Sequence, residues 1–431
     1  MKRAAVGCTP VDMPVDNWTI PDRFAGTVSE VRARPRKTTT CSNSTLTVSH
    51  GGVSMSDEDL NRGLEGIRVA ETRLSDIDGE AGVLTVGGFP VDELARNATY
   101  EESVFLLFED RLPSADELAE FRADLAGRRA IGDEVRAVLQ RAAEEEKPAM
   151  DALRMGAAAA NLGAGEEDPE ADARRVIAVF PTVVATYWRY REGDEPVEPR
   201  EDLRHAANYL YMLNGEEPDE AAVRGLETYL NTVIDHGLNA STFTARTVVS
   251  TESDVVSAAT AAVGTLKGPL HGGAPGPVLD MLRSIHESGD PEGYVHEKLE
   301  AGERLMGFGH RVYRVRDPRA AVLEAAASEF YDEAGDSDFF ETITEFEDVA
   351  VEVLAEHKPG RDLETNVEFY TAALLDGVGV PKELFTTCFA VSRVGGWTAH
   401  ALEQLDDNRL IRPLSSYVGD RDRSWTPVDE R

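Results

Sequence analysis

The sequence predicts an all-α protein with one short hairpin near its N-terminal end. Four segments place apolar residues at the i, i+3, i+4, i+7 spacing of a helix with one buried face. They are YEESVFLLFEDRL (100–112), SADELAEFRADLAG (114–127), IGDEVRAVLQRAAEEE (131–146) and EAAVRGLETYLNTVIDHGL (220–238). Alternating β-branched runs, which are typical of strands, are nearly absent beyond GIRVAETRLSDIDGEAGVLTV (66–86). In that segment the Asp78-Gly79 pair predicts a hairpin turn.

Local signals also predict where helices begin and break. Ser114 and Asp116 are cap-like residues at the start of one helix. Gly/Pro clusters interrupt the helical pattern in AATAAVGTLKGPLHGGAPGPVLDML (258–282) and in GVGVPKELF (377–385). We therefore expect a large helical domain formed by residues 55–272 and 381–431, with a smaller helical domain, 273–380, between them. Residues 1–54 are rich in Ser, Thr, Pro and Gly and lack an amphipathic face, which predicts a disordered extension.

The charge of the chain excludes several classes of partner. The formal net charge is −35; residues 1–54 hold seven Lys/Arg and four Asp/Glu, so the remainder carries −38. An acidic surface repels nucleic acid and anionic membranes. A docking surface for a basic partner would concentrate this charge, whereas here it is scattered, which favours adaptation to a salty cytoplasm.

The three cysteines lie far apart and form no CxxC pair, which argues against a zinc site or a disulfide scaffold. There is no apolar run of about 20 residues and no secretory signal, so we expect a cytoplasmic protein.

The stretch TNVEFYTAAL (365–374) contains one carboxylate, Glu368, at the head of an apolar helical run. From local sequence alone, Thr365-x-x-Glu368 fits a capping box, in which the Thr hydroxyl accepts from the N3 amide and the Glu reaches back. The alternative is that Glu368 takes part in chemistry. Capping is the better interpretation unless another part of the chain argues otherwise.

Three of the nine histidines lie where small residues interrupt a helix: His236 in DHGLNAST, His271 in GPLHGGAPGP and His310 in GFGHRVYRVRDPR. Each alone is more often structural than functional, but glycines beside a histidine let a backbone or ligand approach closely. Metal binding fits poorly, because no HExxH spacing or flanking carboxylate pattern is present. GxxxxGK[ST], a complete GxGxxG and GxSxG are also absent, which argues against nucleotide hydrolysis, hydride transfer and serine hydrolysis.

Arginines accompany these histidines. Four follow His310 closely, and two more lie in VSRVGGW and NRLIRP: Arg311, Arg314, Arg316, Arg319, Arg393 and Arg412. A single surface arginine contributes little, and we interpret Arg311 in that way. A helix break with a histidine and several guanidinium groups can hold a small dianion, since Arg binds carboxylates and phosphates bidentately. The residues predict a site for an anionic small molecule without naming it.

Taken together, GPLHGGA, GFGHRVYRVRDPR, NVEFY and SRVGGW…NRLIRP resemble the citrate synthase family over about Met55 to Arg431. The resemblance implies an all-α homodimer whose large and small domains close over oxaloacetate and an acyl-CoA, with no metal or tightly held cofactor. It implies three catalytic residues, His271 on the thioester oxygen, His310 on the oxaloacetate carbonyl and Glu368 as the base. It also implies binding residues: His236, Asn239, Arg319 and Arg393 for oxaloacetate, Arg412 reaching in from the partner subunit, and Arg314, with Lys267 and Arg316 as weaker candidates, for the CoA phosphates.

The sequence departs from the family pattern in three places. NVEFY carries Glu368 where the family has Asp, a PGP follows HGGA, and VGGFPVDEL replaces a more usual Arg-Gly-Tyr. With the resemblance, catalysis becomes the main interpretation of Glu368, although one carboxylate can also cap a helix. Three functions stay open at this stage: citrate synthesis from acetyl-CoA, 2-methylcitrate synthesis from propionyl-CoA, and a weakly active ligand-binding or regulatory paralogue.

Overall fold

The computed structural model describes residues 60–163, 168–272, 275–310, 312–335, 337–358, 360 and 363–431. The chain divides into two compact units, Met1–Arg62 and Gly63–Arg431, and the second contains the sheet and all of the described α-helices. Within the described ranges the second unit is helical apart from one small sheet, which confirms the all-α prediction. The expected disordered extension, residues 1–54, lies outside the described residues.

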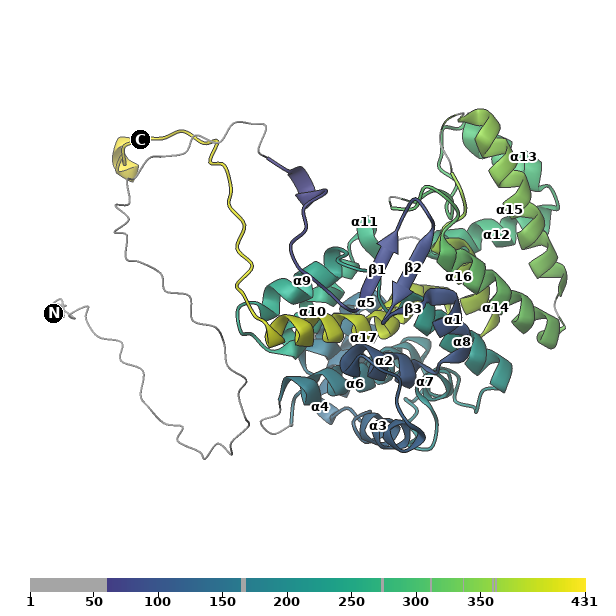
Figure 1. Cartoon of the computed structure of the whole chain (residues 1–431), viewed down its shortest axis with the longest axis horizontal. Coiled ribbons are helices and arrows are strands. Elements are labelled where there is room, and N and C mark those ends of the chain that lie inside the picture. Colours follow the sequence, from purple (N-terminus) through teal and green to yellow (C-terminus); the bar gives the residue numbers. More distant parts are fainter. Residues whose placement is uncertain are drawn as a thin grey trace, which may run out of the picture. The chain divides into compact units, whose positions relative to one another are not determined.

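The described elements are shown in Figure 1. The first described elements along the chain are the short 3-10 helix Arg62–Leu64 (η2) and the three strands Ser75–Asp78 (β1), Val83–Val86 (β2) and Phe89–Pro90 (β3). The first ten helices are Val91–Asn97 (α1), Tyr100–Glu109 (α2), Ala115–Gly127 (α3), Asp133–Glu144 (α4), Ala149–Ala158 (α5), Pro169–Glu192 (α6), His205–Asn214 (α7), Glu220–Val233 (α8), Ala240–Val249 (α9) and Val255–Leu266 (α10). The remaining elements are Pro269–Gly272 (α11), Pro275–Ser288 (α12), Pro291–Glu300 (α13), Pro318–Ala334 (α14), Ser337–His357 (α15), Val367–Gly377 (α16), Lys382–Leu384 (η3), Phe385–Asp406 (α17) and Val428–Glu430 (η4).

The four helices predicted from periodicity are confirmed as α2, α3, α4 and α8. Ser114 caps α3 in a capping box with Glu117, as its type predicts, whereas Asp116 lies inside the first turn and is not the cap. The predicted hairpin is β1–β2, paired antiparallel from Ser75 opposite Val86 to Asp78 opposite Val83. Its connection is four residues, 79–82, longer than the two-residue turn of a minimal hairpin, and β3 adds a third strand that the sequence pattern did not predict.

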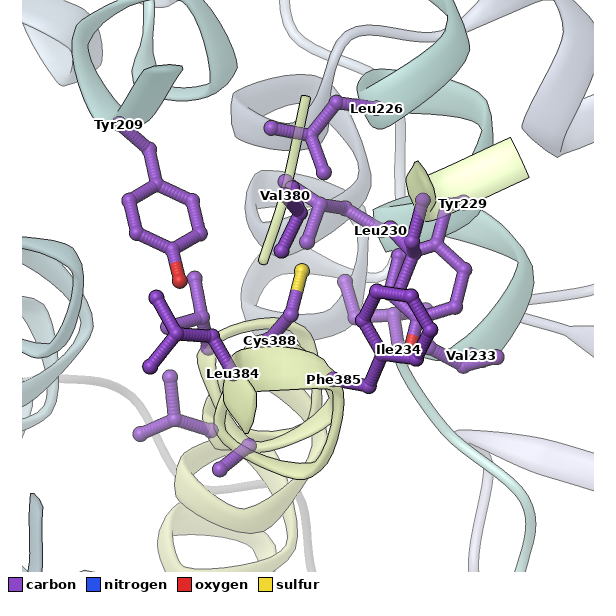
Figure 2. Close-up of a cluster of buried hydrophobic side chains, with 14 of the residues drawn as sticks. Tyr209, Leu226, Tyr229, Leu230, Val233, Ile234, Val380, Leu384, Phe385 and Cys388 are labelled. Carbon is purple, nitrogen blue, oxygen red and sulfur yellow. The ribbon is translucent and has the colours of Figure 1, made fainter. Parts of the chain in front are cut away.

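The core of the large helical group forms around α17, which is buried along most of its length and packs against α6, α8, α9 and α10. Figure 2 shows the cluster where α7, α8 and the start of α17 meet, with the Cys388 side chain among Leu226, Leu230 and Val380. Cys388 is a buried free thiol. This packing gives α17 one fixed position, from which its polar residues reach the loops that follow α8.

A second helical group contains α12, α13, α15 and α16, with α14 packed against α15 and α16 and also against α1 and α8. The predicted helix breaks are confirmed: α10 ends at Leu266 and α11 has only four residues, and α16 ends at Gly377 before η3. The division into a large and a small domain at these breaks stays a prediction. Among the described helices, none combines the length and the apolar character that crossing a membrane requires.

Candidate active site

His236 lies in the loop between α8 and α9, and buried polar contacts fix this loop. Asp235 accepts a hydrogen bond from Ser75 Oγ at 2.5 Å and lies 3.2 Å from His400 Nε2, with the side chains of Asp235 and His400 fully buried. Gly396 of α17 allows the close approach, since a Cβ there would lie well under 3.0 Å from the Ile234 carbonyl oxygen. His236 is itself buried, and burial followed by the charge of Arg319 holds its pKa well below the usual range.

His310 lies in the loop that precedes α14 and has a defined tautomer. Its Nδ1 accepts from the backbone N–H groups of Val312 (3.1 Å) and Tyr313 (3.2 Å), so the proton of the neutral ring is on Nε2. Burial, and then the charge of Arg319, lower the pKa of His310 to about 4. The ring is therefore a neutral N–H donor at neutral pH.

Two buried guanidinium groups lie near this donor. Arg319 pairs with buried Asp317 through Nε (3.0 Å) and Nη2 (2.7 Å), and the same Nη2 is 3.5 Å from His310 Nε2. Both nitrogens are donors, so they do not bond to each other and would converge on one acceptor atom between them. Arg393 of α17 donates from Nε to the Val233 carbonyl (2.6 Å), while its buried Nη2 has no partner among the described residues. Burial lowers the pKa of Arg393 to about 10, and the charge of Arg319 acts in the same direction.

His271 is on the short helix α11 and is held through Ser241, the second residue of α9. The His271 Nε2 atom is 2.8 Å from Ser241 Oγ and 3.3 Å from the Ser241 N–H, which donates to it. Trp397 Nε1 donates to the same hydroxyl at 3.0 Å. With Nε2 as an acceptor, the proton lies on Nδ1, and burial followed by the charge of Arg393 lowers the pKa of His271 to about 4.

Asn239, expected to hold oxaloacetate, is the N-cap of α9. Its Oδ1 accepts from the N–H groups of Ser241 (3.2 Å) and Thr242 (3.1 Å), and its Nδ2 donates to Thr242 Oγ1 (2.9 Å). In this structure the amide group therefore caps α9. Its connection to the site is indirect, because the Ser241 N–H that it accepts from belongs to the residue that contacts His271.

Glu368 is the second residue of α16, and the capping-box interpretation is wrong. The cap is Asn366, whose Oδ1 accepts from the Glu368 N–H at 3.0 Å. Thr365 is still extended, because it forms an isolated antiparallel bridge with Phe308. Two backbone hydrogen bonds, Asn366 N–H to the Gly307 carbonyl and Asp317 N–H to the Thr365 carbonyl, then join the start of α16 to the His310 loop.

The Glu368 carboxylate makes no hydrogen bond or ion pair with any described residue, although the Arg319 and Asp317 charges act on it. Burial raises its pKa to about 7; Arg319 opposes this shift and Asp317 adds to it. A carboxylate with this pKa and no fixed partner is free to take a proton near neutral pH. The structure therefore places Glu368 near Arg319 and Asp317, and Arg319 in turn lies beside His310 and acts on His236.

The other predicted residues do not join this cluster in the described chain. Lys267 Nζ pairs with Asp151 at 2.6 Å, and Arg316 forms ion pairs with Glu347 (2.7 Å) and Glu324 (3.0 Å). Arg314 and Arg412 are exposed, and Arg412 lines a cavity of about 820 Å³ whose walls also come from residues 64–73, from α9 and from the end of α17. Arg311 lies outside the described residues.

Three residues near the predicted ones were not indicated by the sequence: Tyr313 contacts His236 and His310, Ser241 contacts His271, and Trp397 contacts Ser241. Tyr313 is buried, with its Oη 3.0 Å from His236 Nε2 and its ring centroid 5.0 Å from that of His310. Ser241 and Trp397 support His271. Trp397 and Tyr313 stand inside the motifs SRVGGW and GFGHRVYR, but no local pattern indicates their contacts with Ser241 and His236, which are distant in the chain.

The family model described as citrate synthase, C-terminal domain, matches residues 63–414. The chain belongs to the citrate synthase family. A citrate synthase of Haloferax volcanii is 46% identical over 385 residues, which cover 86% of this chain and 99% of that protein. A 2-methylcitrate synthase of Shewanella oneidensis is 35% identical, with 86% and 97% covered. A solved ternary complex of citrate synthase from Thermoplasma acidophilum with carboxymethyl coenzyme A and oxaloacetate has a TM-score of 0.77 at 30% identity, covering 86% of this chain and all of that chain.

As a member of the citrate synthase family, this chain is a transferase of the kind that condenses an acyl-CoA with oxaloacetate, with the thioester as a substrate. In the described part of the chain, no group of three or more His, Cys, Asp or Glu side chains is arranged to hold a metal ion.

Proposed function

We propose that this enzyme forms citrate and CoA from acetyl-CoA, oxaloacetate and water, with His271, His310 and Glu368 as its catalytic residues. The observation that carries the proposal is the convergence of two kinds of group at one place. Two buried guanidinium groups, one with an Nη2 that has no hydrogen-bond partner in the described part of the chain, accompany a neutral imidazole N–H and a carboxylate whose pKa is raised to about 7. Such a set fits a small dianion with a carbonyl, next to a weak carbon acid.

Oxaloacetate would bind through its two carboxylates to Arg319 and Arg393. Both guanidinium groups are buried, so a charge-assisted hydrogen bond to either gains strength from the low local dielectric. The Nε2–H of His310, 3.5 Å from Arg319 Nη2, would then donate to the ketone oxygen and polarise the carbonyl carbon. His236 and Asn239 complete the pocket at the ends of α8 and α9.

The acyl-CoA would be activated between His271 and Glu368. The Nδ1–H of His271 donates to the thioester oxygen while Glu368 removes a proton from the methyl carbon, which gives a neutral or partly charged enol. Because the pKa of His271 is about 4, its ring stays neutral and donates without releasing a proton to the enolate. The enol carbon then attacks the ketone carbon that His310 polarises, and water cleaves the resulting citryl thioester to citrate and CoA.

We assign the CoA phosphates to Arg314, an exposed guanidinium group without a carboxylate partner among the described residues. Lys267 and Arg316 are weaker candidates, because each would have to release an acidic partner first.

The active form is proposed to be a homodimer in which Arg412 enters the partner's site. The segment after α17 supports this, since its large apolar side chains are uncovered: Leu414, Val418 and Trp425 are 84%, 96% and 82% exposed. The acidic surface supports a salty cytoplasm as the working environment.

Propionyl-CoA is the second candidate substrate, because proteins named 2-methylcitrate synthase match the chain along most of its length. The difference is one methyl group, which a pocket discriminates by only about 1–3 kcal/mol. The test is oxaloacetate-dependent release of free CoA from each thioester, followed from low to molar potassium chloride. A higher kcat/KM with acetyl-CoA supports the proposal, a higher one with propionyl-CoA supports the alternative, and no CoA release at any salt concentration contradicts both.

A further inference from the structure

The β1–β2 hairpin touches both loops that carry the proposed oxaloacetate-binding histidines. At its first end, Ser75 Oγ donates to Asp235 Oδ2 at 2.5 Å and accepts from the Gly237 N–H at 2.8 Å. Asp235 and Gly237 are the two residues that flank His236. One serine hydroxyl therefore holds the side chain of the residue before this histidine and the backbone of the residue after it.

At its tip, the same hairpin packs on the loop that follows His310. The Arg314 N–H donates to the Gly79 carbonyl at 2.9 Å. Gly79 also faces the Val312 carbonyl so closely that a Cβ would lie well under 3.0 Å from its oxygen, and a Cβ on Gly82 would lie 2.6 Å from Val315 Cγ2. Only glycine fits this contact. Val312 is one of the two residues whose N–H groups fix the Nδ1 atom of His310.

We propose that the β1–β2 hairpin acts as a strut that sets the position of His236 relative to His310, with Ser75 and Gly79 as positioning residues at its two ends. The two rings are 6.0 Å apart and come from loops 74 residues apart in the sequence. β1 and β2 are joined by four residue pairs, so a displacement at one end of the ladder is transmitted to the other. In Figure 1 the hairpin stands between α11 on one side and α16 on the other.

The strut explains why contacts so far from the reacting atoms would matter to the reaction. The two loops are otherwise joined near the substrate by the Tyr313–His236 hydrogen bond. A displacement of about 1 Å between reacting groups lowers rate by on the order of a hundredfold. The kinetic part of this inference rests on the proposed function, whereas the hydrogen bonds and the steric contact do not.

The test compares substitutions at the two ends of the strut. Ser75→Ala removes both hydrogen bonds that flank His236, so the KM for oxaloacetate should rise about tenfold, with kcat changed by less than about threefold. Ser75→Thr keeps the hydroxyl and should restore the KM. Gly79→Ala pushes on Val312 and hence on His310, so kcat should fall on the order of 10- to 100-fold. Ala81→Ser, at an exposed position of the same turn, is the matched control and should behave as wild type.

Two further measurements separate the strut from simple destabilisation and from failure of the proposed function. Melting temperatures of Ser75→Ala and wild type should agree within a few degrees. Spectra of the protein with ¹⁵N-labelled histidine should show a changed ring environment of His310 in Gly79→Ala and of His236 in Ser75→Ala, and they do not depend on turnover. Wild-type KM and kcat in both variants, with unchanged histidine spectra, would overturn the strut. The strut would also be overturned if melting temperature and kcat fell together, KM rose with them, and Ser75→Thr restored none of the three. An inactive wild type would contradict only the proposed function.

Discussion

Replacing Glu368 by Gln should abolish turnover and stabilise the folded protein at alkaline pH. Burial raises the pKa of this carboxyl group from 4.5 to about 7 in the folded state. The folded protein therefore holds the proton more tightly than the unfolded chain does, and stability falls as pH rises from about 4.5 to about 7. A pKa difference of about 2.5 corresponds to about 3 kcal/mol, which is the full loss expected above pH 7.

A glutamine has nearly the same shape and no charge at any pH, so the free energy of unfolding of Glu368→Gln should not fall as pH rises through this range. Glu368→Gln should exceed wild type in free energy of unfolding by up to about 3 kcal/mol at pH 8 and by less than about 1 kcal/mol at pH 5. The measurement is urea unfolding of both proteins across that range, at constant potassium chloride and constant protein concentration, because a dimer's stability depends on both. Glu80→Gln, on the exposed hairpin turn, is the control and should show no such dependence on pH.

The same carboxylate sets the pH dependence of the rate. As a base it must be ionised, so kcat/KM of wild type should fall below about pH 7, while His271 and His310, with pKa values of about 4, stay neutral there. Glu368→Asp shortens the reach by one methylene and should change turnover measurably in either direction. Wild-type turnover in Glu368→Gln would contradict the role of Glu368 as the base, and an equal effect on stability at pH 5 and pH 8 would contradict its raised pKa.

Four other predictions follow from the site and from the chain's charge. Arg393→Gln should raise the KM for oxaloacetate about 10- to 100-fold, since charged hydrogen bonds contribute about 1.5–3 kcal/mol; an unchanged KM in steady-state kinetics would remove Arg393 from the pocket. Mixing inactive His310→Ala with inactive Arg412→Ala should restore part of the activity, because one site of each hybrid dimer has neither lesion; no recovery after proven subunit exchange would place Arg412 outside the partner's site. Transfer to low salt should reduce activity and dissociate or unfold the protein, as followed by light scattering and circular dichroism, and full activity in dilute buffer would contradict salt adaptation. Deleting residues 1–54 should leave melting temperature and turnover unchanged, and a large drop in either would show that the segment packs on the enzyme.

Sequence reasoning placed the helices well and their caps less well. The periodic segments became α2, α3, α4 and α8, because a buried helical face is a property of residues three and four positions apart. The cap of α16 could not be read in this way. Thr365 and Asn366 are both good N-cap residues, and the choice fell to Asn366 because Thr365 pairs with Phe308, 57 residues earlier.

The motifs alone named the histidines and arginines that the structure gathers, because those residue types stand together in short, specific stretches. The motifs could not show which cationic side chains are available to bind the CoA phosphates, because Lys267 and Arg316 are paired with acidic residues from α5 and α15. They also could not fix the protons of the histidines, which follow from the backbone N–H groups of Val312, Tyr313 and Ser241.

The helical class, the hairpin, the acidic composition and the histidines and arginines proposed to hold a dianion can all be recognised in the sequence, because they depend on neighbours along the chain or on composition. Tertiary structure alone decided the Asn366 cap, the pKa of Glu368 and the contact of Ser75 and Gly79 with two distant loops. These depend on burial and on atoms brought close from distant parts of the chain, and both electrostatic and steric energies are set by distance in space. A sequence pattern carries no record of that distance.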